Sequence, residues 1–129
     1  ELGGPDTPGI GFAIGFDRLV EVMEQLTDTK EVSGPDIFIV ALGEAAMEKA
    51  YHWSCRLNRE GIRTETDFRG KSMKALMKRA DKLNAAHVLI AGENELENNA
   101  VVLRDMNTKA QEDLPVDTLV SELISRIKE

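Results

Sequence analysis

The sequence predicts an α/β fold in which a mixed five-stranded sheet is flanked by three helices and preceded by a short strand and helix. The first observation is that short apolar runs alternate with amphipathic stretches over residues 37–91. This alternation is typical of parallel strands joined by right-handed helical crossovers. The second observation is two further strand-like runs, at 100–104 and 109–113, which add antiparallel edge strands.

The start of the chain is predicted to form a glycine-lined strand that turns into a helix. Apolar residues at helical spacing predict the helix at 14–26. We expect its apolar face to be buried on this domain or on another copy. The stretch 27–35 is polar, lacks periodicity and ends in Ser-Gly-Pro, so we place a domain boundary there. The predicted domains are 1–34 and 35–129.

The second domain begins with a buried strand at 37–42, followed by a helix at 44–60 that Gly61 terminates. The expected inner face of this helix is Met47, Ala50, Tyr51, Ser54 and Leu57. A short strand at 62–66 comes next, and Ser72 is the expected N-cap of a helix that reaches Leu83.

The continuous apolar run at 87–91 predicts a strand that is buried on both faces. The polar residues 93–99 are expected to form a turn before the strand at 100–104. Asp105 opens a second turn, because Asp and Asn side chains bond nearby backbone groups. A last helix is predicted at 116–127.

Charge is distributed unevenly along the chain. The net charge is −7, which argues against a protein that coats DNA or RNA through bulk electrostatics. Residues 56–82, however, hold nine Lys or Arg against four Asp or Glu. This basic stripe can hold a polyanion in one place on an acidic body. The alternative is a solvated helix face, and composition alone leaves both open.

Several classes of protein are excluded by composition. The single Cys55 cannot form an internal disulfide and indicates a reducing compartment. The longest glycine-containing apolar run, 9–16, is too short to cross a bilayer, and no secretory signal is visible. We therefore expect a cytoplasmic protein without membrane association. Because the first residue is Glu1, we expect a piece of a longer chain.

The glycines at 9–15 follow a GxGxxxG pattern that differs from the dinucleotide fingerprint and lacks the end of a P-loop. What remains is an open backbone that leads into a helix bearing Arg18. The planar fork of an arginine can hold phosphate oxygens over such a backbone. The alternative is that Arg18 pairs with Asp17 or with another carboxylate on the helix.

Three segments of the chain, in two regions, carry a family resemblance. LGGPDTPGIGFAIGFDRL, at residues 2–19, resembles the third signature motif of class II aminoacyl-tRNA synthetases, in the form found in histidyl-tRNA synthetases. DIFIVALG, at 36–43, and FRGKSMKALMKRADKLNAAHVLIAGENELENNAVVLRDM, at 68–106, resemble the C-terminal anticodon-binding domain of the same family. The two signals are independent and occur in the expected order.

The resemblance implies that the parent enzyme uses ATP with Mg²⁺ to activate histidine, transfers it to histidine tRNA and forms a homodimer. It also implies that Arg18 is a catalytic residue that holds the γ-phosphate of ATP. The residues implied beside the adenine are Gly11, Phe12, Ala13 and Gly15. Asp17 departs from the family, which usually has glutamate there. The other class motifs lie outside this sequence, so we expect no aminoacylation and no cofactor for this chain alone.

The anticodon interpretation also has support from the residues themselves. RNA loops are recognised through unstacked bases that are read at their edges and stacked on side chains. Glu95 and Arg104 lie on opposite arms of one predicted hairpin, so we expect them to face one pocket. Their chemistry suits the GUG anticodon that the resemblance implies. The other predicted tRNA-binding residues are Asn94, with Phe68 or Met106 supporting a base, and Arg69, Lys71, Lys74 and Lys78 on phosphates. For each of these residues, an ordinary exposed side chain is the alternative.

No metal site is predicted, because His52 and His87 lack partners at metal-ligand spacing. Cys55 has no nearby histidine that would make it a nucleophile. Trp53 is expected to serve in packing or in a contact with a catalytic domain. A second functional hypothesis is a synthetase-like regulatory or interaction module without aminoacylation activity, which uses the same sheet to contact a protein.

Overall fold

The structure is a computed structural model that describes residues 4, 8–26 and 33–128. The chain divides into two compact units, Glu1–Val32 and Ser33–Glu129. The boundary predicted from the sequence lies two residues beyond this division. The assignment of the first unit to a catalytic domain stays a prediction.

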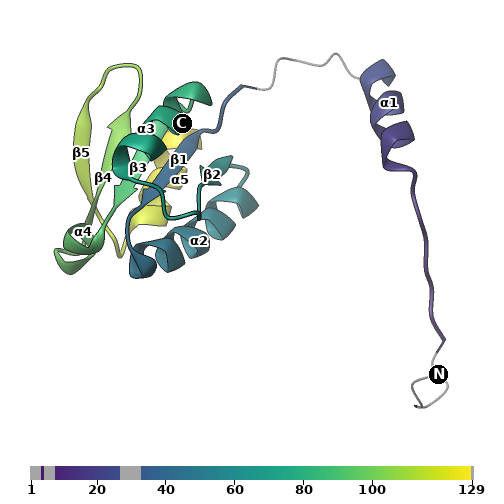
Figure 1. Cartoon of the computed structure of the whole chain (residues 1–129), viewed down its shortest axis with the longest axis horizontal. Helices are drawn as coiled ribbons and strands as arrows, with labels where there is room; N and C mark the ends of the chain where they lie inside the picture. The colour runs from purple at the N-terminus through teal and green to yellow at the C-terminus, as the bar shows by residue number, and fades with distance from the viewer. Residues whose placement is uncertain (1–3, 5–7, 27–32, 129) are drawn as a thin grey trace. The chain divides into compact units, whose positions relative to one another are not determined.

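The second unit contains one five-stranded sheet (Figure 1). Its strands are β1 (Ile37–Ala41), β2 (Thr64–Thr66), β3 (His87–Ala91), β4 (Ala100–Asp105) and β5 (Gln111–Pro115). The spatial order is β2-β1-β3-β4-β5. β1 pairs in parallel with β2 and β3, whereas β4 pairs antiparallel with β3 and β5. The predicted mixed sheet is confirmed.

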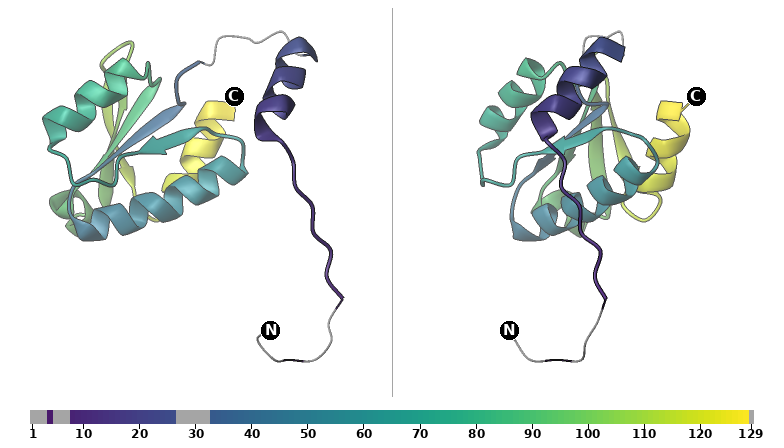
Figure 2. Two further views of the ribbon diagram at one scale, coloured as in Figure 1. Left: turned by 45° about the vertical axis from the view of Figure 1, so that its right-hand side comes forward. Right: turned by 90° about the vertical axis from the view of Figure 1, so that its right-hand side faces the viewer.

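Three helices of ten or more residues cover the sheet, as predicted. They are α2 (Glu44–Arg59), α3 (Met73–Lys82) and α5 (Leu119–Lys128). α3 lies on one side of the sheet and α5 on the other (Figure 2). Apolar residues of α2 join the same buried cluster as those of α5. Two helices therefore cover one face of the sheet and one helix covers the other.

The face under α2 and α5, which we call the closed face, holds the larger part of the core. Alternate strand residues point into it because side chains along a strand alternate between the two faces. On the sheet these residues are Ile37, Ile39, Ala41, Leu89, Ala91, Val101, Leu103 and Leu114. Leu119 and Leu123 of α5 and Leu57 of α2 are fully buried against them.

The opposite face, which we call the α3 face, has a smaller core. Phe38 and Val40 of β1 and Val88 of β3 are fully buried beneath Leu76 and Ala80 of α3. No residue of β5 belongs to this cluster among the described residues. The α3 face is thus packed over the first three strands.

The inner stripe of α2 differs from the predicted one. Ala46, Ala50, Trp53 and Leu57 are buried, whereas Tyr51 is 56% exposed. The prediction that Tyr51 faces the core was wrong. Tyrosine carries a hydroxyl that needs a partner when it is buried, and the closed face instead receives the larger apolar surface of tryptophan. The packing role expected for Trp53 is confirmed.

The polar stretch after β3 forms the short helix α4 (Glu93–Glu97) rather than the predicted turn. Acidic side chains in its first turn favour the helix because they complement the positive end of the helix dipole. Asn99 then adopts φ of 52°, a left-handed conformation that Asn tolerates. The predicted turn at Asp105 is confirmed, since its Oδ1 accepts hydrogen bonds from the backbone N–H groups of Asn107 and Thr108 at 2.7 and 2.8 Å.

The described part of the first unit contains one helix, α1 (Phe16–Leu26), which begins two residues after its predicted start. Residues 8–15 have no regular secondary structure, so the predicted strand there was wrong. A strand needs a hydrogen-bonded neighbour. At Gly9, Gly11 and Gly15, however, no other described part of the chain lies within 4 Å of the position that a Cβ atom would take. No residue of α1 is buried. A surface that covers its apolar side stays a prediction.

Candidate nucleic-acid interface

The α3 face is covered over β1 and β3 but left uncovered by any described helix over β4 and β5 (Figure 1). In register, Val88 pairs with Arg104, Ile90 with Val102, and Val102 with Asp113. Residues directly opposite one another in a sheet point to the same face. We define the open sheet face by Ile90, Val102, Arg104, Gln111 and Asp113. All five side chains are half-buried or exposed, so the face is available to a partner.

Arg104 stands near one end of this open sheet face, beside Gln111 of β5. Its Nε is buried and has no hydrogen-bond partner among the described residues. A buried donor without an acceptor costs about 1–3 kcal/mol. A ligand cannot reach this buried nitrogen directly, but the half-buried side chain has no ion pair among the described residues, so the rest of its guanidinium is a candidate for a ligand contact.

Glu95 and Asn94 lie at the other end of the same face. They line a hollow of about 210 Å³ together with Asn98, Val102 and Asp113. Arg104, which was predicted to share one pocket with Glu95, does not line this hollow. α4 places Glu95 beyond the end of β3, whereas Arg104 pairs with Val88 near the beginning of that strand. The structure therefore sets the two residues along one face rather than in one pocket.

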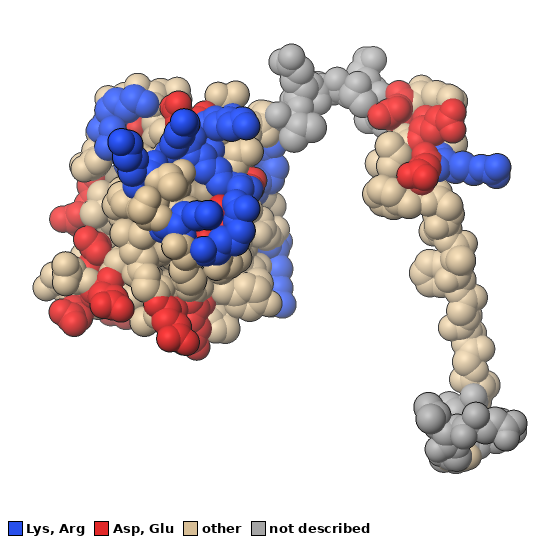
Figure 3. All heavy atoms as spheres, viewed as in Figure 1, with Lys and Arg blue, Asp and Glu red and all other residues tan. Residues whose placement is uncertain are grey.

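A basic surface borders the open sheet face. Figure 3 shows Lys and Arg side chains gathered over α3, with acidic side chains gathered toward α4. We define the α3 basic surface by the exposed residues Arg69, Lys71, Lys74, Lys78 and Lys82. Among the described residues, the four lysines of this surface have no hydrogen bond or ion pair. Unpaired cations of this kind are suited to phosphate groups.

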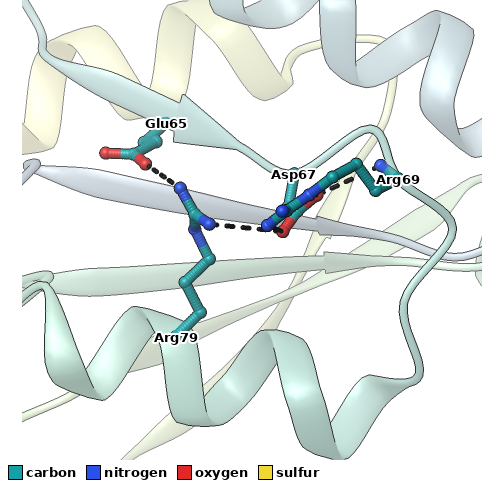
Figure 4. Close-up of polar contacts among 4 residues, drawn as sticks. All are labelled: Glu65, Asp67, Arg69 and Arg79. Carbon is teal, nitrogen blue, oxygen red and sulfur yellow. Dashed lines mark hydrogen bonds and ion pairs between the residues drawn. The ribbon is translucent and has the colours of Figure 1, made fainter.

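The cationic loop before α3 is anchored by a buried carboxylate (Figure 4). The side chain of Asp67 is 4% exposed, and it accepts hydrogen bonds from Arg69 Nε at 2.8 Å and from Arg69 Nη2 at 2.6 Å. Arg79 Nη1 approaches it at 3.5 Å, while Arg79 Nη2 donates to Glu65 at 2.9 Å. The Arg69 hydrogen bond holds the pKa of Asp67 well below its usual range. Asp67 thus stays charged and fixes the Arg69 guanidinium at the surface.

This geometry can be compared with known proteins. Residues 36–126 match the family model described as the anticodon binding domain, which is more than half of the chain. The chain belongs to the anticodon-binding domain family. The predicted resemblance to an anticodon-binding domain and the predicted mixed sheet with flanking helices are therefore confirmed, and the second unit is called the anticodon-binding domain below.

The relatives are synthetases. The chain is 57% identical over 124 residues to the histidine–tRNA ligase of Desulforapulum autotrophicum, which covers 96% of this chain and 29% of that protein. It is 46% identical over 116 residues to the histidine–tRNA ligase of Geobacter sulfurreducens, which covers 90% of this chain and 27% of that protein. The chain thus spans less than a third of the length of these relatives.

Solved structures agree with this assignment. Apo histidyl-tRNA synthetase from S. aureus matches with a TM-score of 0.67 and 30% identity, over 83% of this chain and 32% of that chain. The RNA binding domain of threonyl-tRNA synthetase from Cryptosporidium parvum matches with a TM-score of 0.61 and 25% identity. That match covers 70% of this chain and 23% of the other.

Phe68 and Met106, the two residues predicted to support an RNA base, have different surroundings in the anticodon-binding domain. Phe68 is 51% exposed and contacts the Tyr51 ring, with the two ring centroids 6.4 Å apart. Met106 is half-buried and packs against the core of the α3 face, and its backbone N–H donates to Ala86 at 2.9 Å. Phe68 is therefore the better placed of the two to stack on a base.

Some residues of this candidate interface were not singled out in the sequence. Tyr51 was expected inside, Asp113 was not considered, and Asp67 and Arg79 were not recognised as an anchor. The spacing of Asp67 and Arg69 was visible, since residues two apart on an extended segment lie on the same side. The contact of Arg79 with Asp67 depends on the tertiary structure and left no local signal.

The predicted nucleotide-binding residues belong to the first unit. Gly11, Phe12, Ala13 and Gly15 lie in the exposed segment before α1, and Arg18 lies in the first turn of that helix. No ion pair joins Arg18 to a carboxylate within the described residues. Their role toward ATP stays a prediction.

Metal-ligating residues do not gather in the part of the chain that the structure describes, where no group of three His, Cys, Asp or Glu side chains could hold an ion. None of the described helices combines the length and the apolar character that crossing a bilayer requires.

Proposed function

We propose that this chain is the C-terminal part of a histidine–tRNA ligase and that its anticodon-binding domain binds the anticodon region of histidine tRNA. The observation that carries the proposal is the open sheet face, which has Arg104 at one end, Glu95 near the other and the α3 basic surface along its side. An uncovered sheet face next to unpaired cations suits an unstacked RNA loop, because bases need a surface and phosphates need positive charge.

The chemistry of the two ends suits a GUG triplet. The carboxylate of Glu95 can accept hydrogen bonds from the N1–H and N2–H₂ groups of a guanine. Arg104 can donate to guanine O6 and N7 or to a phosphate. Because the two residues lie along one face rather than in one pocket, they contact different nucleotides of the loop.

We further propose that the parent enzyme activates histidine with ATP and Mg²⁺ and works in the cytoplasm as a homodimer. In that enzyme Arg18 holds the γ-phosphate, and Gly11, Phe12, Ala13 and Gly15 lie beside the adenine. We propose that the chain alone does not activate histidine, because it spans less than a third of the length of the relatives it matches. Pyrophosphate exchange that depends on histidine and ATP is the test, and exchange by the purified chain would contradict this part of the proposal.

Binding of a stem-loop tests the anticodon part of the proposal. The chain is titrated against labelled RNA stem-loops that carry GUG or the same bases in scrambled order, at two salt concentrations. A good bidentate base contact is worth about 1–3 kcal/mol, so the GUG loop should bind about tenfold more tightly or better. Affinity for both RNAs should fall with salt. Equal affinity for the two loops would refute anticodon recognition.

A further inference from the structure

The two exposed aromatic rings of the anticodon-binding domain are in contact with each other. This domain has four aromatic residues, of which Phe38 and Trp53 are buried in the two cores. The other two, Tyr51 and Phe68, are 56% and 51% exposed, and their rings meet at an interplanar angle of 65°. His52 adds a third ring, whose centroid is 5.8 Å from that of Tyr51. Exposed aromatic rings that cluster on a water-soluble surface usually mark a binding site.

The position of this pair separates it from the open sheet face. Tyr51 lies on the outer side of α2, and Phe68 follows β2, which is the edge strand farthest from β5. Three strand spacings separate β2 from β4, or roughly 14 Å. One base cannot stack on Tyr51 and Phe68 and also contact Arg104.

The charge beside the rings indicates which partner the pair binds. Arg69 follows Phe68 directly, and the buried carboxylate of Asp67 holds its guanidinium in place through two hydrogen bonds. Lys71 is exposed in the same loop and has no ion pair within the described residues. A ring pair beside an immobilised guanidinium and a free ammonium matches one nucleotide, whose base stacks and whose phosphate is anionic.

We propose that the ring of Phe68, which Tyr51 contacts edge-to-face, forms a stacking platform for one unstacked RNA nucleotide outside the anticodon triplet, with Arg69 and Lys71 holding its phosphate. The proposal rests on the proposed function, because it assumes that the chain binds an RNA stem-loop. The platform accepts any base, since every base has a stacking face. It therefore adds affinity without adding triplet specificity.

The test combines protein variants with abasic RNA. Stem-loops are made with an abasic site at each loop position outside the triplet, and each is titrated against the full chain and against Tyr51→Ala and Phe68→Ala. One abasic position should weaken binding to the unchanged chain by about tenfold to a hundredfold. The same position should have little further effect on either variant, because the stacking contact is already lost. Each variant should retain its preference for GUG over the scrambled triplet.

Two further variants accompany this test of protein variants against abasic RNA. Tyr51→Phe restores the ring that Tyr51→Ala removes, so it should recover the coupling to the abasic position. Phe16→Ala removes another exposed aromatic ring, in the first unit, and should also leave RNA affinity unchanged. Both platform residues are exposed, so circular dichroism should show folded variants.

The outcomes separate the two proposals. If the triplet preference is present but no abasic position is coupled to Tyr51 or Phe68, the platform is refuted and the anticodon function stands. If coupling is found while GUG and scrambled loops bind equally, the platform stands and anticodon recognition fails. If neither RNA binds, both proposals are overturned. If Tyr51→Ala and Phe68→Ala bind every RNA as tightly as the unchanged chain does, the platform is also refuted. The two rings would then be assigned to a protein-binding surface.

Discussion

The two faces of the sheet have the same strands but different covers. The closed face is buried under α2 and α5, and its residues from β1, β3, β4 and β5 form one apolar cluster. The α3 face is buried only as far as β3, and beyond it Arg104 and Asp113 meet solvent. The α3 side therefore combines a smaller core with a free sheet surface. This difference indicates that stability depends mainly on one face, while the other is available for binding.

Truncating one side chain on each face tests this difference in stability most strongly. Leu123→Ala removes a fully buried side chain from the closed face and should lower the free energy of unfolding by about 2–5 kcal/mol. Val102→Ala, on the open sheet face, should cost about 1 kcal/mol or less, because Val102 is only half-buried. Urea unfolding at matched protein concentration measures both. Similar losses from the two substitutions would show that the faces are not divided in this way.

The second prediction concerns Arg104. Arg104→Gln should lower affinity for the GUG stem-loop by about 1–3 kcal/mol, because a bidentate contact is lost. Stability should change little, since Arg104 Nε makes no hydrogen bond within the described residues.

Arg126→Gln is the matched control for Arg104. Arg126 lies on α5 and pairs with Glu112 and Glu122, so its loss should leave RNA affinity intact. Filter binding of both variants would answer the question. Loss of affinity with Arg126→Gln, and none with Arg104→Gln, would place the RNA on the wrong face for this account.

The third prediction sharpens the role assigned to the α3 basic surface. Lys74→Glu and Lys78→Glu together should reduce the salt dependence of RNA binding, with the slope of log K against log salt falling by about 1.4 in magnitude. Lys109→Glu, in the turn before β5, is the control and should leave the slope near that of the unchanged chain. An unchanged slope in the double variant would show that these lysines do not contact phosphates.

The smallest predicted effect concerns acid. The Arg69 hydrogen bond lowers the pKa of Asp67, and backbone hydrogen bonds from Thr108 and Asn107 lower that of Asp105. A lowered pKa in the folded state means that stability is complete above the ordinary value of 3.8 and is lost as pH falls below it. Urea midpoints should therefore be steady from neutral pH to about pH 5 and fall below about pH 4.

Asp67→Asn tests the share of the acid effect that belongs to the Asp67 anchor. The variant should have a flatter fall of stability in acid than the unchanged chain, because the amide does not titrate. It should also bind RNA more weakly at neutral pH, since Arg69 loses its charged partner. A fall in acid as steep as that of the unchanged chain would assign the effect to other carboxylates.

The sequence predicted most of the fold because hydrophobic period and order reflect local rules. The apolar run at 37–42 and the alternation that follows led to the correct mixed sheet. The prediction that Tyr51 is buried was wrong, because the choice between neighbouring positions for the inner stripe of α2 depends on which side chain fits the closed face. The prediction of a turn at 93–99 was wrong. A polar stretch rich in Asn resembles a turn, but the acidic residues at its start favour a helix.

The candidate interface was predicted in its parts but not in its arrangement. Phe68, Arg69 and Lys71 were singled out because aromatic and basic residues in one loop are informative on their own, and their contact with RNA stays a prediction. The separation of Glu95 from Arg104 was missed, because the register of β3 and β4 and the formation of α4 decide it. The anchor between Asp67 and Arg79 joins two elements and is visible only in the folded chain.

Methyl NMR signals from the two faces of the sheet test the central claim most directly. Val101 and Val102 are neighbours on β4, but Val101 is buried in the closed face and Val102 lies on the open sheet face. On saturation with the GUG stem-loop, the methyl signals of Val102 and Ile90 should shift while those of Val101 and Leu123 stay in place. Shifts at Val101 and Leu123, with none at Val102 and Ile90, would contradict the account.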